Sequence, residues 1–319
     1  QDVTAPHTME FTVGFHQEII DDLSVALTFI TKTKKNIFED VLYEPDSDQG
    51  WYTLEQDTQG WWVPFSTIIP QTDEYSATPV TVYFLSPEAP LMFMQFRNVP
   101  ELQRRYRGFE IAFKKRMSHN WQLTGSLTLS KATGNIGLGH AAASGHTRAA
   151  DSPNYFVNLS DDSRLEFDRP LIFKLAGTYR FPYNIFLSLF YLHTSGVPWA
   201  RTVTIFPPED FLAGGEVSAI PATVFLESPG TRRTEAIDSL DIRVEKEFWM
   251  SPNTRVSFLL DVFNVLGNSY EWEVLDDGGS WYPAGENSSE GIRILSPNYK
   301  KITSRTGVRS FRIGLRLRF

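Results

Sequence analysis

Two groups of residues in this 319-residue chain could bind a metal ion, and both fall short of a known type of site. His140, His146 and Asp151 share one polar stretch, but their spacing is not that of a zinc site or another metal site. The acidic stretch 46–50 (DSDQG) begins like a calcium loop, yet its glycine comes one position early and the third ligand is missing. We therefore expect solvated polar loops and no cofactor, with calcium in an external loop as the alternative left open.

Residues for catalysis are not marked either. A hydrolase needs a nucleophile beside a general base, and His16 shares one strand face with Glu10 and Thr12 but with no marked nucleophile. The chain has no cysteine, which excludes a disulfide framework and thiolate metal sites. The glycine-rich stretch 134–139 (GNIGLG) neither leads from a strand into a helix nor carries a lysine, so it does not indicate a phosphate site. We expect no enzyme, and the net charge of −8 argues against nucleic acid as a partner.

Many of the charged residues instead follow a period of two, most clearly in the stretch 307–319 (GVRSFRIGLRLRF). Successive side chains of a strand point to opposite faces, so this pattern predicts a strand with one apolar face and one polar face. Alternation that closes on an aromatic residue is similar to the last strand of outer-membrane β-barrels, where it also serves as the assembly signal. The residues of this predicted signal are Phe311, Ile313, Leu315, Leu317 and Phe319.

The same alternation occurs in eight further stretches, which are 9–16, 23–29, 108–114, 121–130, 171–181, 185–192, 240–248 and 255–262. The stretch 185–192 has apolar residues on both faces, so its faces are less distinct. Short links follow the first, third, fifth and seventh stretches. Long polar links follow the others, at about 34–103, 132–166, 195–236 and 266–306.

This order of short and long links is typical of outer-membrane β-barrels, which have short periplasmic turns and long external loops. Strands of about 11–13 residues would cross the bilayer when tilted by roughly 40°. We therefore predict an all-β fold, an antiparallel transmembrane β-barrel with about nine strands here. It would lie in the lipid of a Gram-negative outer membrane, with the long loops outside the cell and the C-terminus at the periplasmic side.

The polar strand faces would line the lumen of such a barrel, where mixed charges on neighbouring strands pair. The predicted lumen-facing residues include Glu110, Lys174, Arg243, Glu245, Arg312 and Arg316. Aromatic residues gather near both strand ends, as in the interface girdles of membrane barrels. Those near the short links are Trp121, Phe181, Tyr183, Phe248, Trp249 and Phe319, and those near the long links are Tyr191, Trp199, Tyr270 and Trp272.

Tryptophans of the long links are the candidate ligand contacts. Loop packing or anchoring at the membrane interface explains them equally well. These candidates are Trp61, Trp62, Trp199, Trp272 and Trp281.

Several motifs together resemble the late barrel strands of TonB-dependent outer-membrane receptors. The stretch 165–170 (LEFDRP) runs into 173–179 (FKLAGTY), and 195–198 (SGVP) follows the sixth strand. The pair 240–246 (LDIRVEK) and 260–266 (LDVFNVL) is still more similar. The resemblance covers nearly the whole chain, strand by strand, and the nearest subgroup is the Oar-like receptors that carry a carboxypeptidase-regulatory-like domain.

The resemblance implies uptake of a ligand, driven by a TonB-type energy-coupling protein, through a barrel of about 22 strands with a plug domain. With nine strands and no plug, residues 1–319 would be the C-terminal part of such a barrel. Open sheet edges cannot face lipid. The resemblance therefore implies that roughly 13 further strands and a plug come from the same protein or from another chain.

Two other functions stay open from the sequence. One is a passive or structural outer-membrane barrel that acts in adhesion or assembly through its long external loops. The other is a soluble β-rich adhesin, because a high aromatic content of 14% also fits a large soluble β-protein. An upstream plug and TonB box would favour transport, and extraction without detergent would favour the soluble protein.

Overall fold

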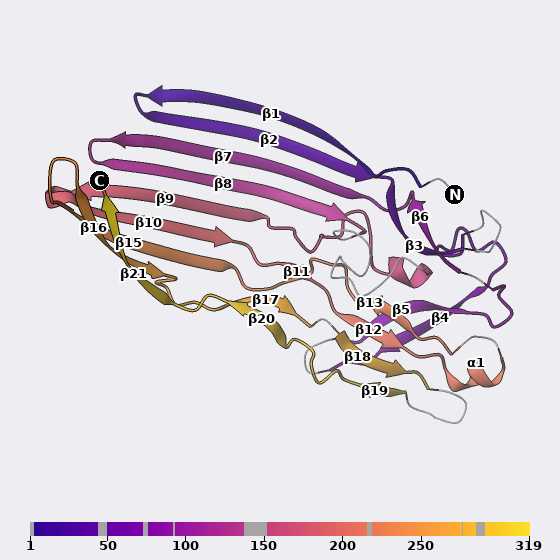
Figure 1. The fold of residues 1–319 in the computed structure, drawn as a ribbon. Coiled ribbons are helices and arrows are strands. Elements are labelled where there is room, and N and C mark those ends of the chain that lie inside the picture. Colours follow the sequence, from indigo (N-terminus) through magenta and orange to yellow (C-terminus); the bar gives the residue numbers. More distant parts are fainter. Residues whose placement is uncertain are drawn as a thin grey trace.

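The computed structural model describes residues 3–43, 50–72, 76–91, 93–136, 152–215, 219–275, 277–284 and 291–319. Nine long strands form one antiparallel sheet in which chain order and spatial order agree (Figure 1). They are β1 (His7–Ile20), β2 (Leu23–Lys35), β7 (Arg104–Ser118), β8 (Trp121–Gly134), β9 (Leu171–Phe181), β10 (Ile185–Thr194), β15 (Ile237–Trp249), β16 (Arg255–Phe263) and β21 (Ser310–Arg318). This sheet confirms the predicted nine strands, although their lengths of 9 to 15 residues vary more than expected.

Tight turns join these strands in pairs at one end of the sheet, and the long links lie at the other end (Figure 1). His119 and Asn120 in the β7–β8 turn both have positive φ, at 50° and 66°. Two such residues in a two-residue loop are typical of the turn whose twist matches that of paired strands. The β9–β10 turn contains η2 (Pro182–Asn184), where Tyr183 also has positive φ. The predicted alternation of short and long links is therefore confirmed.

The two faces of the sheet differ in the reverse of the usual way. Along β16 the polar residues Ser257 and Asp261 are 2% and 4% exposed, whereas Phe258 is 55% exposed and Leu260 is 44% exposed. In a soluble protein the apolar face would be the covered one. We call the apolar side of the large sheet the outward face and the side that carries Asp261 the inward face.

Cross-strand register extends each face over the whole sheet. Val13, Phe29, Phe109, Leu129 and Leu171 are successive partners on β1, β2, β7, β8 and β9, so they form one apolar row on the outward face. Strand β10 has apolar residues on both faces, and the register assigns them. Phe190 pairs with Asp241 and therefore lies on the inward face.

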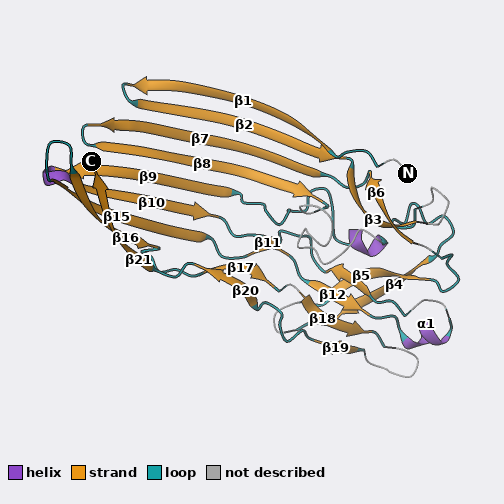
Figure 2. Cartoon of the chain, in the orientation of Figure 1, coloured by secondary structure: helices purple, strands orange, loops and turns teal. Residues whose placement is uncertain are grey.

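The described parts of the long links carry short strands, one α-helix and one 3-10 helix, and we call the four links together the cap (Figure 2). The link after β2 holds β3 (Ile37–Tyr43), β4 (Trp62–Ile69), β5 (Thr78–Leu85) and β6 (Phe93–Val99), and the link after β8 holds η1 (Pro153–Phe156). The link after β10 holds β11 (Pro198–Trp199), β12 (Thr202–Ile205), α1 (Glu209–Ala213), β13 (Ala222–Phe225) and β14 (Arg232–Arg233). The link after β16 holds β17 (Tyr270–Val274), β18 (Asp277–Tyr282), β19 (Ile292–Ile294) and β20 (Ile302–Thr306).

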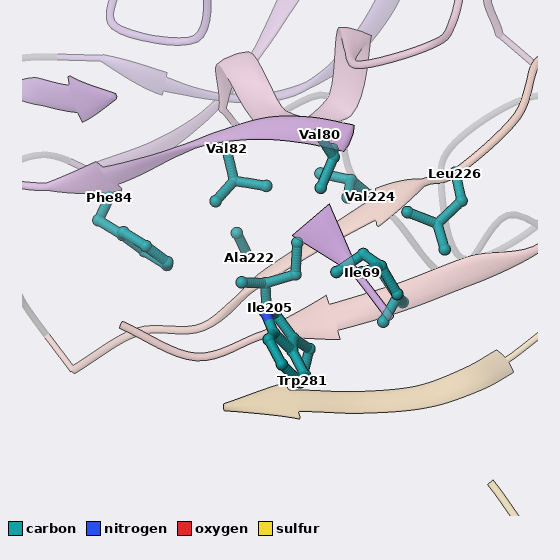
Figure 3. Packing of buried hydrophobic residues seen from close by; sticks show 10 residues of the cluster. Ile69, Val80, Val82, Phe84, Ile205, Ala222, Val224, Leu226 and Trp281 are labelled. Atoms are coloured by element: carbon teal, nitrogen blue, oxygen red, sulfur yellow. The ribbon is translucent and has the colours of Figure 1, made fainter. Parts of the chain in front are cut away.

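The apolar cores of the molecule lie in the cap rather than in the large sheet. One core joins β4, β5, β12, β13 and β18, and Figure 3 shows its side chains turned toward one another from these strands. Its buried residues are Ile69, Val80, Val82, Phe84, Val203, Ile205, Ala222, Val224, Leu226 and Trp281. A second core joins the links after β2 and β8, with Ile37, Val41, Tyr43, Tyr52, Val99, Leu102, Ile136 and Tyr155.

Strands β1 and β21 form the two edges of the large sheet, and each pairs on one side with β2 or β16. All fourteen residues of β1 are exposed on both faces. Among the described residues no helix combines the length and apolarity that crossing a membrane would require.

Candidate functional site

An ion-pair network occupies the inward face where β15, β16 and β21 lie side by side. Arg243, Asp261 and Arg312 are direct partners in the register of these three strands. Asp261 accepts hydrogen bonds from Arg243 Nε at 2.5 Å and from Arg312 Nε at 2.7 Å. Because the carboxylate is almost fully buried, the two guanidinium groups take the place of its lost hydration.

The same network continues toward the tight turns. Arg316 Nη1 lies 3.4 Å from Glu245 Oε1, and Glu247 lies between Arg255 at 3.6 Å and Arg318 at 4.0 Å. Both glutamates are nearly buried. Acidic side chains therefore come from β15 and β16, and most of the cations come from β21.

Four predicted lumen residues, Arg243, Glu245, Arg312 and Arg316, are thus brought together on one face. The other two lie on the same face but farther away. Glu110 accepts a hydrogen bond from Thr128 Oγ1 at 3.3 Å. Lys174 follows in the register from Ala112 and Ser126, and it lines a separate hollow.

That hollow of about 460 Å³ lies against the inward face of β1, β2 and β7 to β10. Its walls are made mostly by small side chains, such as Ala112 and Ser126, and by Gly125. Its charged or titratable groups are His16, Lys114 and Lys174. The arrangement offers the ammonium groups of Lys114 and Lys174 and the hydroxyl groups of Ser24, Thr124 and Ser126.

A buried junction holds two long links together near the sheet, the link after β8 and the link after β10. The Asp168 carboxylate is fully buried, accepts a hydrogen bond from the backbone N–H of Ala132 at 2.6 Å and pairs with Arg233. Arg233 also donates to the carbonyl oxygens of Asp168 and Gly196, each at 3.0 Å. The link after β8 is thereby fixed to both ends of the link after β10, at Gly196 and at Arg233.

Neighbouring residues add to this junction. Arg169 donates to the Ser195 carbonyl oxygen at 2.5 Å, and the Ser195 hydroxyl accepts from the Leu171 backbone N–H at 3.1 Å. Burial, and to a lesser degree the charge of Arg233, lowers the pKa of Arg169. The motifs 165–170 and 195–198 therefore have a structural role. The sequence did not indicate the junction, since its partners are 65 residues apart in the chain.

Two of the candidate ligand-binding tryptophans are buried, which corrects that prediction for them. Trp281 belongs to the first cap core and donates its indole N–H to Thr67 Oγ1 at 3.0 Å (Figure 3). Trp62 donates its indole N–H to the Trp51 carbonyl oxygen at 2.6 Å. Both indoles serve loop packing, the alternative that the sequence left open, because a buried ring has no face left for a ligand.

The remaining tryptophans are not brought together into one site. Trp61 is half-buried next to Trp62, and its backbone N–H donates to Asp57 Oδ1 at 2.9 Å. Trp199 is half-buried and lies between the Tyr299 ring, 6.2 Å away, and the Arg232 guanidinium, 5.4 Å away. Trp272 belongs to β17, but its side chain lies outside the described residues.

The two predicted aromatic girdles differ. At the tight-turn end, the six residues are all exposed, which fits side chains that meet a membrane interface: Trp121, Phe181, Tyr183, Phe248, Trp249 and Phe319. At the long-link end, Tyr270 is only 4% exposed, so it is a packing residue and the girdle prediction is wrong for it. Tyr191 there donates to Asp238 Oδ1 at 2.6 Å.

The weak metal candidates cannot be placed. His140, His146, Asp151 and the acids of the stretch 46–50 lie outside the described residues. Over the part of the chain that the structure describes, no group of three or more His, Asp or Glu side chains could hold a metal ion.

Comparison with known proteins gives no match to a protein-family model and no match to a curated protein. Solved structures do match. The outer-membrane transporter YddB from Escherichia coli is similar over all of this chain and 33% of its own, with a TM-score of 0.51 and 10% identity. The chain has the fold of part of an outer-membrane β-barrel. At this identity the likeness concerns the fold alone.

Two further solved structures match with lower scores. The ferric-catecholate import receptor Fiu from E. coli K12 has a TM-score of 0.48 and 14% identity, over 98% of this chain and 28% of its own. The ferripyoverdine receptor of the Pseudomonas aeruginosa outer membrane has a TM-score of 0.45 and 9% identity, over 98% and 27%. The chain thus spans about a third or less of the length of these proteins.

Proposed function

We propose that residues 1–319 are the C-terminal barrel part of a TonB-dependent outer-membrane receptor that imports a scarce ligand. The observation that carries this proposal is the large sheet, whose outward face is apolar and exposed and whose inward face holds buried ion pairs around Asp261. Lipid on one side and an aqueous or plugged lumen on the other is the environment that such a sheet requires.

The open edges β1 and β21 support the incomplete barrel. Unpaired backbone groups in hydrocarbon cost several kcal/mol each, to order of magnitude, so both edges need partner strands. We propose that roughly 13 further strands pair with them and that a plug fills the lumen, as the family resemblance implies. The energy-coupling partner would be a TonB-type protein.

The orientation and the subgroup belong to the same proposal. Tight turns are periplasmic in barrels of this kind, which would place the C-terminal residue Phe319 at the periplasmic side and the cap outside the cell. The motifs 165–170, 195–198, 240–246 and 260–266 support the Oar-like receptors as the subgroup.

Electrical recording tests the proposal without knowledge of the ligand. The full-length protein that contains this chain is inserted into planar bilayers in potassium chloride, with a variant that lacks any upstream plug-like domain as the matched control. A plugged receptor conducts no ions, and the truncated variant conducts. Steady conductance of the full-length protein would favour a passive barrel and contradict the proposal that the protein is a plugged receptor.

A second measurement tests the partner and the assembly signal. We expect the tagged full-length protein to retain a TonB-type protein after chemical cross-linking in cells, and its absence would contradict energy coupling. We also expect Phe319→Ser to reduce the amount of protein in outer-membrane fractions, whereas Val308→Ser, an equally exposed site outside the strands, should not. Equal amounts of both variants would contradict the signal.

A further inference from the structure

Four cations gather on the outward face of β2, β7 and β8, at the ends of these strands that lead into the long links. They are Lys35, Arg105, Arg107 and Lys131, and we call them the cation patch. Register places Arg107 opposite both Thr31 and Lys131, two residues beyond Phe109 and Leu129 of the apolar row and on the same face. The patch therefore begins where the apolar band of the outward face ends.

The patch holds like charges at close range. Arg107 and Lys131 are directly opposite each other on antiparallel strands, where Cβ atoms are roughly 4.5–5.5 Å apart and like charges repel. Both side chains are exposed, as is that of Lys35. None of these three has a carboxylate within ion-pair distance among the described residues, and Arg105 alone has one, Asp161 at 3.5 Å.

Several cations on the inward face of the sheet have acidic partners. Lys32 pairs with Glu10 at 3.0 Å, and both belong to the inward-facing parity of β1 and β2. The inward cations of β15 and β21 likewise have acidic partners in Asp261 and Glu245. The three unpaired cations of the patch, Lys35, Arg107 and Lys131, thus differ from these ion-paired inward cations.

The opposite end of the outward face provides the sharpest contrast. Lys115 there folds back on its turn, with Nζ at 2.6 Å from Ser118 Oγ, at 3.2 Å from the Ser118 carbonyl oxygen and at 4.2 Å from the Trp121 ring. Lys246 donates to the Tyr183 carbonyl oxygen. Outward-facing lysines at the tight turns are therefore satisfied by the protein itself, and those of the cation patch are not.

We propose that the cation patch binds the phosphate groups of a phosphorylated lipid in the leaflet that surrounds the long-link ends of the strands. The phosphate group of the lipid supplies the missing anion between Arg107 and Lys131, and the acyl chains of the lipid lie on the adjoining apolar row. The hydroxyl groups of Thr31 and Thr33 lie on the same face and can donate to it. The proposal needs the chain to lie in a membrane but does not depend on ligand import.

The test uses the full-length barrel in nanodiscs of phosphatidylcholine doped with phosphatidic acid, with retained lipid counted by native mass spectrometry. The variant Arg107→Gln/Lys131→Gln should lower the affinity for phosphatidic acid by roughly thirtyfold, since two phosphate-facing charges are lost. The matched variant Lys34→Gln/Lys114→Gln removes the same charge from the inward face of β2 and β7 and should leave the affinity within about twofold.

The remaining arms identify the ligand chemistry. Diacylglycerol, which has the same chains without phosphate, should not be retained, and inorganic phosphate alone should not compete at equal concentration. The conservative variant Arg107→Lys/Lys131→Arg should bind as the wild type does, which separates charge loss from misfolding. Equal losses in the outward and inward variants, retention of diacylglycerol, or full competition by inorganic phosphate would each overturn the proposal. None of these three outcomes bears on the conductance of the full-length protein, so the lipid proposal and the receptor proposal can fail separately.

Discussion

Strands β5 and β16 have the same two-residue period but bury opposite kinds of side chain. In β5 the buried residues are Val80, Val82 and Phe84, and Thr81 and Tyr83 between them are half-buried. In β16 the most buried residues include Ser257 and Asp261, and the exposed residues are apolar. One chain therefore contains a cap that buries its apolar side chains and a sheet that exposes them.

The difference shows what a period of two can specify. It identifies a strand and tells which side chains share a face, because successive Cβ atoms point to opposite sides. It does not tell which face is covered. That answer comes from the partners of each strand, which in the cap are other apolar strands and in the large sheet are ion-paired neighbours.

The largest effect is expected from a charge placed in the cap core. Ile69→Asp puts a carboxylate at a position that is 1% exposed, so we expect a loss of more than about 4 kcal/mol and an unfolded cap. The neighbouring Ile68→Asp changes the same residue type at a position that is 61% exposed and should be nearly neutral. Limited proteolysis of the cap in the detergent-solubilised protein measures both, and equal cleavage would show that the core is not packed.

A charge on the outward face of the sheet should rank next. Leu260→Arg places a cation among lipid chains, and near the bilayer midplane this costs about 2–4 kcal/mol of folding free energy. Leu212→Arg in α1 of the cap begins from a similar exposure but faces water, so the unfolding midpoint in urea should hardly move. Unfolding in lipid bilayers, followed by tryptophan fluorescence, compares the two. Equal midpoints would mean that the outward face does not contact lipid.

Loss of the central inward-facing carboxylate should have a smaller cost. Asp261→Asn leaves Arg243 and Arg312 without their anion. We expect a loss of about 2 kcal/mol, below the value for a fully buried pair, because the two guanidinium groups remain partly hydrated. The same unfolding assay measures it. A midpoint equal to that of the wild type would contradict a structural role for the network.

The smallest effect is expected at the other edge of the sheet. Glu10→Gln breaks the pair with Lys32, and both side chains are more than 40% exposed. Water replaces such a partner readily, so we expect no measurable change in the unfolding midpoint. A shift as large as that of Asp261→Asn would mean that β1 is covered in the assembled barrel.

The large sheet was predictable because its signal is local. The stretches 240–248 and 307–319 show their two faces within a few residues, and the turns at 119–120 and 182–184 stand between clear strands. The cap was less predictable. The stretch 78–85 of β5 does alternate, but β3 and β6 pair across 50 to 62 residues and neither has a clear period.

The candidate site divides in the same way. Arg243, Glu245, Arg312 and Arg316 were predicted to share a face, since parity alone decides that. The burial of Trp62 and Trp281 depends on contacts with distant segments, as does the pairing of Asp168 with Arg233. Nothing close to those residues in the chain marks such contacts.

The two edge strands of the large sheet have a practical consequence for the purification of this chain. In hydrocarbon, β1 and β21 each present a row of amide and carbonyl groups that only another strand can neutralise, and a second copy of the same polypeptide is the nearest supply. Copies of the chain expressed without partner strands should therefore associate edge to edge into extended sheets. A soluble, monodisperse preparation requires that the complementary strands be co-expressed.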